Sequence, residues 1–217
     1  IDPVFLCSTE KYDELIEKAE IKYANEYFFA YILDPSPEWG EAIINLTERT
    51  GKKAIIIFNE GSDKQEAIQR LNISGNSVEY FTEADVCEWL YCFKNASFVI
   101  TDSFHGACFS IIFNRMFVVL RNNGRGGRRF DCLLKMAGLE SQMVTNVSQI
   151  KDLFDEKISN SVIDFEAVKN RLNYEKEKGN EWLKNALEGK IQLEKSRILE
   201  EAVTDVQNSV SAEPIKL

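Results

Sequence analysis

The single histidine of the 217-residue chain, His105, lies where an apolar segment gives way to polar residues. Residues 97–101 have the continuous apolar centre of a buried parallel strand, and residues 102–106 read Asp-Ser-Phe-His-Gly. The next helix is expected to begin near Ser103, which puts His105 in its first turn. Unpaired N–H groups and the dipole at such a helix start favour a bound anion, and an imidazole there can transfer protons near neutral pH.

A second polar segment follows the apolar run at residues 116–120. Residues 121–129 read Arg-Asn-Asn-Gly-Arg-Gly-Gly-Arg-Arg, which places four arginines in a glycine-rich loop of a chain whose net charge is −9. Guanidinium groups this close repel one another unless an anion or carboxylates lie between them, and they match carboxylate and phosphate oxygens in pairs. The histidine segment and the arginine loop together predict an anion-binding site.

Each of these residues also has a purely structural interpretation. A lone histidine is more often a solvated or hydrogen-bonded side chain than a catalyst, and the arginine loop could be a solvated turn. Asp102 and Ser103 could be helix N-caps. Gly106 removes a side chain where a ligand or a neighbouring strand approaches closely. Cys108 falls on the same helix side as core residues, so a nucleophilic role is not expected.

Composition excludes several classes of protein. A hydrophobic fraction of 44% is that of a globular chain, and no stretch approaches the roughly 20 apolar residues of a membrane span. The negative charge argues against a nucleic-acid surface. The opening residues lack a signal sequence and read as the interior of a longer chain, so we expect a fragment. The five scattered cysteines predict reduced, buried thiols and no metal site: Cys7, Cys87, Cys92, Cys108 and Cys132.

Apolar runs alternate with amphipathic segments along most of the chain. Gly51 and Gly138 are expected to end helices. This alternation predicts an α/β fold, a Rossmann-like parallel sheet flanked by helices. Strands are expected at residues 27–33, 54–58, 77–81, 97–101 and 116–120, and helices at residues 38–50, 64–71, 86–95, from about 103 to 113, and 129–137.

The remaining chain is helical and charged, with helices expected at residues 147–154 and 164–187. The second of these carries one apolar stripe: Phe165, Val168, Leu172, Trp182, Leu183 and Leu187. Four parts are expected: a lead-in or interdomain segment at 1–26, a Rossmann-like domain with the predicted anion-binding site at 27–145, helices packing on that domain at 146–190, and a charged helical or frayed tail at 191–217.

With these residues identified, the chain resembles the C-terminal half of the polysaccharide pyruvyl transferase family. The specific part of the resemblance is Thr101-Asp102-Ser103-Phe104-His105-Gly106, and the likeness spans roughly residues 2 to 187. Met116 departs from the family, which commonly has proline there. Supporting stretches are residues 2–6, 86–96, 109–114, 129–134 and 138–140.

The resemblance implies transfer of the enolpyruvyl unit of phosphoenolpyruvate to two hydroxyls of a bacterial surface polysaccharide or its precursor, which gives a pyruvate ketal. It implies a glycosyltransferase-B-like arrangement, in which a second, N-terminal Rossmann-like domain completes the cleft, so the fragment alone is expected to offer half of the site and to lack turnover. Phosphoenolpyruvate is the donor substrate, and no cofactor or metal is expected. The acceptor is a glycan or a lipid-linked saccharide.

On this reading, His105 transfers protons and contacts the donor. Ser103 and the Gly106 backbone bind the phosphate or carboxylate, and Arg125 and Arg129 clamp the anion. The loop's other arginines, Arg128 and Arg121, rank below them. Asp102 is an N-cap or an orienter of His105, because a carboxylate would repel the donor.

Two other functions remain open on the sequence. One is a glycosyltransferase domain that binds a nucleotide sugar, since the same helix start and basic loop suit a diphosphate. The other is a noncatalytic sugar- or anion-binding module. A cytoplasmic location is expected, with a peripheral position at the inner face of the membrane as the alternative.

Overall fold

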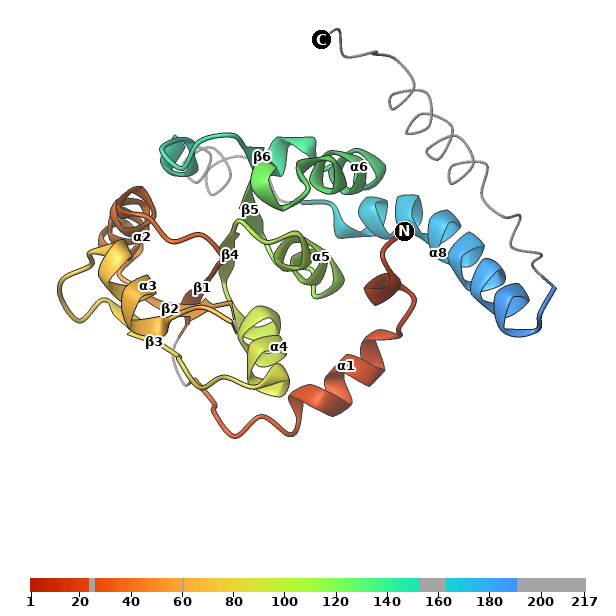
Figure 1. The fold of residues 1–217 in the computed structure, drawn as a ribbon, viewed down its shortest axis with the longest axis horizontal. Coiled ribbons are helices and arrows are strands. Elements are labelled where there is room, and N and C mark those ends of the chain that lie inside the picture. The colour runs from red at the N-terminus through yellow and green to blue at the C-terminus, as the bar shows by residue number, and fades with distance from the viewer. Residues whose placement is uncertain (24–25, 60, 153–162, 191–217) are drawn as a thin grey trace, which may run out of the picture. The chain divides into compact units, whose positions relative to one another are not determined.

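The computed structural model describes residues 1–23, 26–59, 61–152 and 163–190, and its centre is a parallel sheet (Figure 1). The sheet has six strands in the order β3-β2-β1-β4-β5-β6. Neighbouring strands are parallel throughout, which confirms the expected Rossmann-like architecture. The strands are β1 (Tyr27–Ile32), β2 (Lys53–Phe58), β3 (Val78–Tyr80), β4 (Phe98–Thr101), β5 (Phe117–Leu120) and β6 (Met143–Val144).

The alternation of side chains along each strand divides the core into two layers. Phe29 of β1 and Val99 of β4 belong to one buried cluster, whereas their neighbours Phe28 and Ile100 belong to the other. Both faces are therefore apolar, as a parallel sheet covered by helices on both sides requires. A fully buried side chain of this size contributes about 1.5–3 kcal/mol to stability.

Helices cover both faces of the sheet (Figure 1). Trp39, Ile43 and Leu46 place α2 in the cluster of Phe28, which α3 joins through Leu71. The helices α4, α5 and α6 pack in the cluster of Phe29 on the other face. The helices are α1 (Thr9–Ile16), α2 (Pro37–Thr50), α3 (Lys64–Leu71), α4 (Val86–Asn95), α5 (Phe104–Ile112), α6 (Gly127–Ala137) and α8 (Phe165–Leu187).

Local signals set most of the helix ends. Asp85 and Glu88 form a reciprocal capping box at the start of α4, with both hydrogen bonds at 2.9 Å. Gly51 and Gly138 adopt left-handed conformations, with φ of 68° and 70°, and end α2 and α6 as expected.

The first sixteen residues pack on the sheet domain. They form the short helix η1 (Pro3–Phe5) and α1. Phe5 and Ile16 are buried in the cluster of Phe29. The Lys94 ammonium of α4 lies 2.6 Å from the carboxylate of Asp13 in α1. These contacts fix the start of the chain beside α4 and α5.

The C-terminal helix departs from the expected apolar stripe. Val168 and Leu172 are buried, and Phe165 packs against the same cluster. Trp182, Leu183 and Leu187 are instead exposed. The chain divides into two compact units, residues 1–177 and 178–217, so α8 contributes to both. Residues 149–152 are helical, while the rest of the helix expected up to residue 154 and the tail at 191–217 lie outside the described residues.

In the part of the chain that the structure describes, no helix combines the length and apolar character needed to cross a membrane. The longest, α8, has 23 residues but carries many charged side chains.

The buried carboxylate of Asp102 joins the ends of two neighbouring strands, β1 and β4. Its Oδ1 accepts a hydrogen bond from the N–H of Leu33 at 2.7 Å, and its Oδ2 accepts one from the N–H of Asp34 at 3.0 Å. Only 1% of Asp102 is exposed. Burial raises the pKa of Asp102 to about 6, although the two N–H groups act in the opposite direction.

This titration makes stability depend on pH. The folded state keeps the Asp102 proton up to a pKa of about 6, whereas the unfolded state releases it near pH 4. The free energy of unfolding should therefore fall by about 2 to 3 kcal/mol as pH rises from about 4 to about 7.5. Urea unfolding of the wild type and of Asp102→Asn at each pH isolates the effect. Parallel pH profiles for the two proteins would contradict it.

A second prediction concerns the contact between α2 and α3. A Cβ at Gly40 would collide with the backbone carbonyl oxygen of Leu71, which cannot rotate away. We expect Gly40→Ala to lower the free energy of unfolding by about 1–3 kcal/mol. Gly61→Ala is the control, because a Cβ at Gly61 meets no atom within 4 Å. Urea unfolding followed by tryptophan fluorescence measures both, and equal stabilities of the two variants would disprove the close approach.

Candidate functional site

The order of the strands reverses between β1 and β4. From β1 the chain proceeds to β2 and β3 on one side, and then returns to place β4, β5 and β6 on the other side. Ligands of open parallel sheets bind in the crevice outside the carboxyl ends of the strands at such a switch point. The residues that follow β1 and β4 are Leu33-Asp34 and Asp102-Ser103, so the sequence motif lies at this crevice.

The turn from β4 into α5 is fixed by its own side chains. Thr101 Oγ1 donates to the carbonyl oxygen of Tyr31 at 2.6 Å and accepts from the N–H of Ser103 at 3.0 Å. Ser103 Oγ accepts from the N–H of Gly106 at 3.3 Å, which makes Ser103 the N-cap of α5. A Cβ on Gly106 would collide with the Thr101 side chain, so this glycine allows the close approach of helix and strand.

These contacts correct two expectations for the motif. The N–H of Gly106 is occupied by Ser103 in this structure and so is not a free anion donor. Asp102 is neither the N-cap of α5 nor an orienter of His105, because its two oxygens accept from the backbone of the β1 loop.

The carboxylate of Asp34 anchors the arginine loop over this turn. Arg125 donates to both oxygens of Asp34, from Nε at 3.0 Å and from an Nη at 2.8 Å, and Asn122 donates to the same group at 2.6 Å. The hydrogen bonds from Arg125 hold the pKa of Asp34 below its usual value. Arg125 therefore anchors the loop, and its assignment to anion clamping stays a prediction.

A carboxylate also pairs with Arg121. Its Nε and one Nη donate to Asp131 of α6 at 2.8 and 2.6 Å, and another Nη contacts Asn123. Arg128 is exposed and does not line the pocket described below. The expected carboxylates between crowded arginines are thus Asp34 and Asp131.

Arg129 has a different environment. Its guanidinium lies over the ring of Phe104, 4.7 Å from the centroid, and donates to the carbonyl oxygen of Arg125 at 2.9 Å. Within the described ranges, no carboxylate lies within ion-pair distance of Arg129. Stacking on an aromatic ring orients the guanidinium while leaving donors for an anion.

His105 presents its imidazole beside this arginine. Half of the His105 side chain is exposed, and its ring lies 5.6 Å from that of Phe104. Nε2 is 3.8 Å from Oδ2 of Asp2, a distance for charge attraction rather than a direct hydrogen bond. The other oxygen of Asp2 accepts from the N–H of Val4, which fixes the carboxylate at the start of η1.

One pocket of about 500 Å³ collects these groups. It brings together four residues predicted from the sequence, and leaves Asp102, Gly106 and Arg128 outside its lining. We name it the basic pocket. Its lining residues are Leu33, Ser103, Phe104, His105, Arg125, Gly126 and Arg129.

Sequence reasoning missed three residues of the site. Asp34 anchors Arg125, Phe104 supports Arg129, and Asp2 faces His105. Asp2 lies in the first stretch of the family resemblance, and Phe104 lies in its central motif. Asp34 follows the first apolar strand, which is the position where parallel sheets commonly carry functional polar residues.

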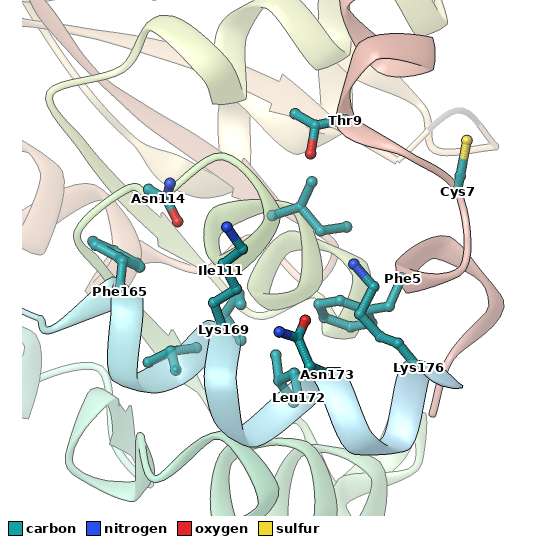
Figure 2. A pocket seen from close by; sticks show the side chains of 12 residues that line it. Phe5, Cys7, Thr9, Ile111, Asn114, Phe165, Lys169, Leu172, Asn173 and Lys176 are labelled. Atoms are coloured by element: carbon teal, nitrogen blue, oxygen red, sulfur yellow. The ribbon is translucent and has the colours of Figure 1, made fainter. Parts of the chain in front are cut away.

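A separate pocket of about 200 Å³ lies at the other end of α5 (Figure 2). Its lining includes Ile111 and Asn114 near the end of α5, together with Phe5 and Lys169. It contains none of the residues predicted for the site.

The cysteines are not arranged for chemistry at the basic pocket. Cys108 is buried, and burial raises the pKa of its thiol. Cys7 and Cys132 are exposed, contrary to the expectation of buried thiols. The described residues contain no group of three or more His, Cys, Asp or Glu side chains that could hold a metal ion.

Two solved structures resemble the fold. UDP-GlcNAc 2-epimerase from Methanocaldococcus jannaschii, in complex with UDP-GlcNAc and UDP, gives a TM-score of 0.55 at 14% identity, over 76% of this chain and 51% of that one. UDP-GlcNAc 2-epimerase from Neisseria meningitidis, bound to UDP-GlcNAc, gives a TM-score of 0.50 at 13% identity, over 69% of this chain and 42% of that one. The chain thus spans about half the length of these proteins or less. The likeness confirms the Rossmann-like, glycosyltransferase-B-like fold.

No curated protein sequence matches the chain. A family model described as polysaccharide pyruvyl transferase matches residues 1–124, which is more than half of the chain. The match ends well before residue 187, the expected limit of the resemblance, but it includes the histidine motif and the start of the arginine loop. The chain belongs to the polysaccharide pyruvyl transferase family.

Proposed function

We propose that the protein transfers the enolpyruvyl group of phosphoenolpyruvate to two hydroxyls of a saccharide and releases phosphate. The observation that carries the proposal is the basic pocket, where His105 and Arg129 line one crevice at the β1/β4 switch point. The family match supports the chemistry, since this family is one of transferases that act on polysaccharides. The saccharide would be a bacterial surface polysaccharide or its precursor, encountered in the cytoplasm or at the inner face of the membrane.

The donor fits the charges of this pocket. Phosphoenolpyruvate carries its phosphate and its carboxylate on the same carbon, and guanidinium forks pair with either group. Arg129 supplies a guanidinium without a carboxylate partner in the described part of the chain. Arg125 holds the arginine loop in place through Asp34 and adds its positive charge to the lining of the basic pocket. The start of α5 contributes the positive end of its dipole.

The reaction needs proton transfers that an imidazole can perform. The C=C π bond and the C–O bond to phosphate break, the terminal carbon of the enol gains a proton, and the central carbon forms two C–O bonds to the saccharide hydroxyls, which lose their protons. One released proton balances the new methyl C–H bond, and the other leaves with phosphate. In this proposal His105 delivers and collects these protons, with Asp2 orienting and stabilising the imidazolium.

A nucleotide-sugar transferase is the second candidate. Structural neighbours of this fold were solved with UDP-GlcNAc, and a diphosphate also suits a helix start beside an arginine. Uridine diphosphate binding separates the two candidates. If the chain is instead a noncatalytic sugar- or anion-binding module, the third candidate, it should bind its ligand without turnover.

Arg129 should determine donor binding. We expect Arg129→Ala to weaken phosphoenolpyruvate binding by about tenfold or more, since a charge-assisted hydrogen bond is removed. Thermal unfolding with phosphoenolpyruvate, uridine diphosphate and inorganic phosphate at matched ionic strength measures it, because a ligand of the native state raises the midpoint. Arg128→Ala is the control, since it removes an adjacent charge outside the pocket. Equal losses in both variants, or stabilisation by uridine diphosphate alone, would refute the assignment.

His105 and Asp2 should differ in their kinetic effects. We expect His105→Gln to lower kcat by about 100-fold or more, as loss of a general acid–base does. Asp2→Asn should lower kcat by about five- to tenfold and leave the KM for phosphoenolpyruvate within about twofold, because Asp2 faces His105 but does not line the pocket. Phosphate-release assays measure both constants. A His105→Gln enzyme within about threefold of wild type would remove the central catalytic assignment.

A further inference from the structure

A second crevice opens beside the basic pocket, at the carboxyl ends of β1 and β2. It measures about 550 Å³ and continues from Tyr31 over Phe58 to the loop before α4. Tyr31 lies two residues before Leu33, which lines the basic pocket. Both pockets therefore lie near the end of β1, one on its β4 side and one on its β2 side. We name the second one the aromatic pocket.

Aromatic rings form much of its wall. Tyr31 and Trp89 meet edge to face, with ring centroids 5.3 Å apart. Phe81 is half-buried and follows the end of β3, whereas the buried side chain of Phe58 belongs to the cluster on the other face of the sheet. The indole Nε1 of Trp89 is buried and has no acceptor among the residues that the structure describes.

Carboxylates dominate the polar part of this lining. Asp85 is fixed by the capping box of α4, in which its Oδ1 accepts from Glu88. Glu83 is exposed, and in the described part of the chain no cation lies within ion-pair distance of it. The cation of the lining, Lys64, donates to the carbonyl oxygen of Asn59 at 2.7 Å. The rim therefore repels phosphate and carboxylate groups, in contrast to the basic pocket.

We propose that the aromatic pocket binds a neutral pyranose ring of the saccharide acceptor. The inference rests on the proposed function and gives the acceptor a place beside the donor. A pyranose has an apolar C–H face that packs on aromatic rings, and hydroxyls that donate to carboxylates such as Glu83. Phosphoenolpyruvate and nucleoside diphosphates are disfavoured here, because their negative charges would face Glu83 and Asp85.

The indole N–H signals of the protein provide the test. The chain has three tryptophans: Trp89 lines the pocket, Trp39 is a buried residue of α2, and Trp182 lies on α8. The 15N-labelled 217-residue chain is titrated with the methyl glycosides of glucose, galactose and mannose, and Trp89→Phe assigns the signal. We expect at least one glycoside to move the Trp89 signal saturably, while the signals of Trp39 and Trp182 stay in place.

Matched variants make the test specific. Phe81→Ala should weaken the glycoside affinity by about five- to tenfold. Phe165→Ala, which removes a half-buried aromatic ring from the pocket of Figure 2, should leave the affinity unchanged. The inference is overturned if no glycoside moves the Trp89 signal, if Phe81→Ala leaves the glycoside affinity unchanged, or if uridine diphosphate moves the signal and the glycosides do not.

The titration separates this inference from the proposed function. Phosphoenolpyruvate binding is followed on the same sample by its thermal shift, which depends on Arg129. Donor binding without a glycoside response overturns the acceptor site alone. A glycoside response without donor binding leaves the sugar site and overturns the assignment of the donor to the basic pocket.

Discussion

The site depends on one buried carboxylate that ties two strand ends together. Asp102 takes its hydrogen bonds from the backbone of Leu33 and Asp34, so the residues after β4 and after β1 are held at a fixed separation. The same contact orients Asp34 toward Arg125, which then anchors the arginine loop. An ionised carboxylate in this position is costly, as its raised pKa reflects. In return for this free-energy cost, the Asp102 carboxylate holds the ends of β1 and β4 in the geometry that forms the crevice.

An acidic protein thus presents two adjacent pockets of opposite character. The basic pocket gathers imidazole and guanidinium groups around the start of α5, and Asp34 and Asp131 neutralise the arginines that shape the loop. The aromatic pocket carries carboxylates at its rim and rings in its wall. Both lie outside the carboxyl ends of parallel strands, and β1 separates them. This division suits a reaction between an anionic donor and a neutral acceptor.

Local patterns in the sequence predicted most of the fold, because strands buried on both faces and glycine-ended helices have strong signatures. The range of α4, for example, follows from its capping box and apolar face. The exposure of Trp182 and Leu187 could not be predicted from the sequence, because periodicity identifies an apolar stripe without showing what covers it. The match to the family also ends earlier than the motifs beyond residue 124 suggested.

The candidate site was predictable only where its residues are neighbours in sequence. His105 and Ser103 share one turn, and the arginines share one loop. The pairing of Arg125 with Asp34 joins residues 91 positions apart, and that of His105 with Asp2 joins opposite ends of the matched region. Such contacts depend on strand order, which local patterns do not specify. For the same reason local patterns assign Asp102 to the helix that follows it and not to a contact with the end of β1.

Product analysis in deuterated water tests the central claim most directly. The chain, joined to the N-terminal domain that the resemblance implies, is incubated with phosphoenolpyruvate and a panel of saccharide acceptors, and the products are examined by mass spectrometry and NMR. The account predicts released phosphate and a saccharide ketal whose methyl group carries one solvent deuterium, with both products lost in His105→Gln. Glycosyl transfer from a nucleotide sugar, or the absence of ketal and phosphate from every acceptor, would contradict it.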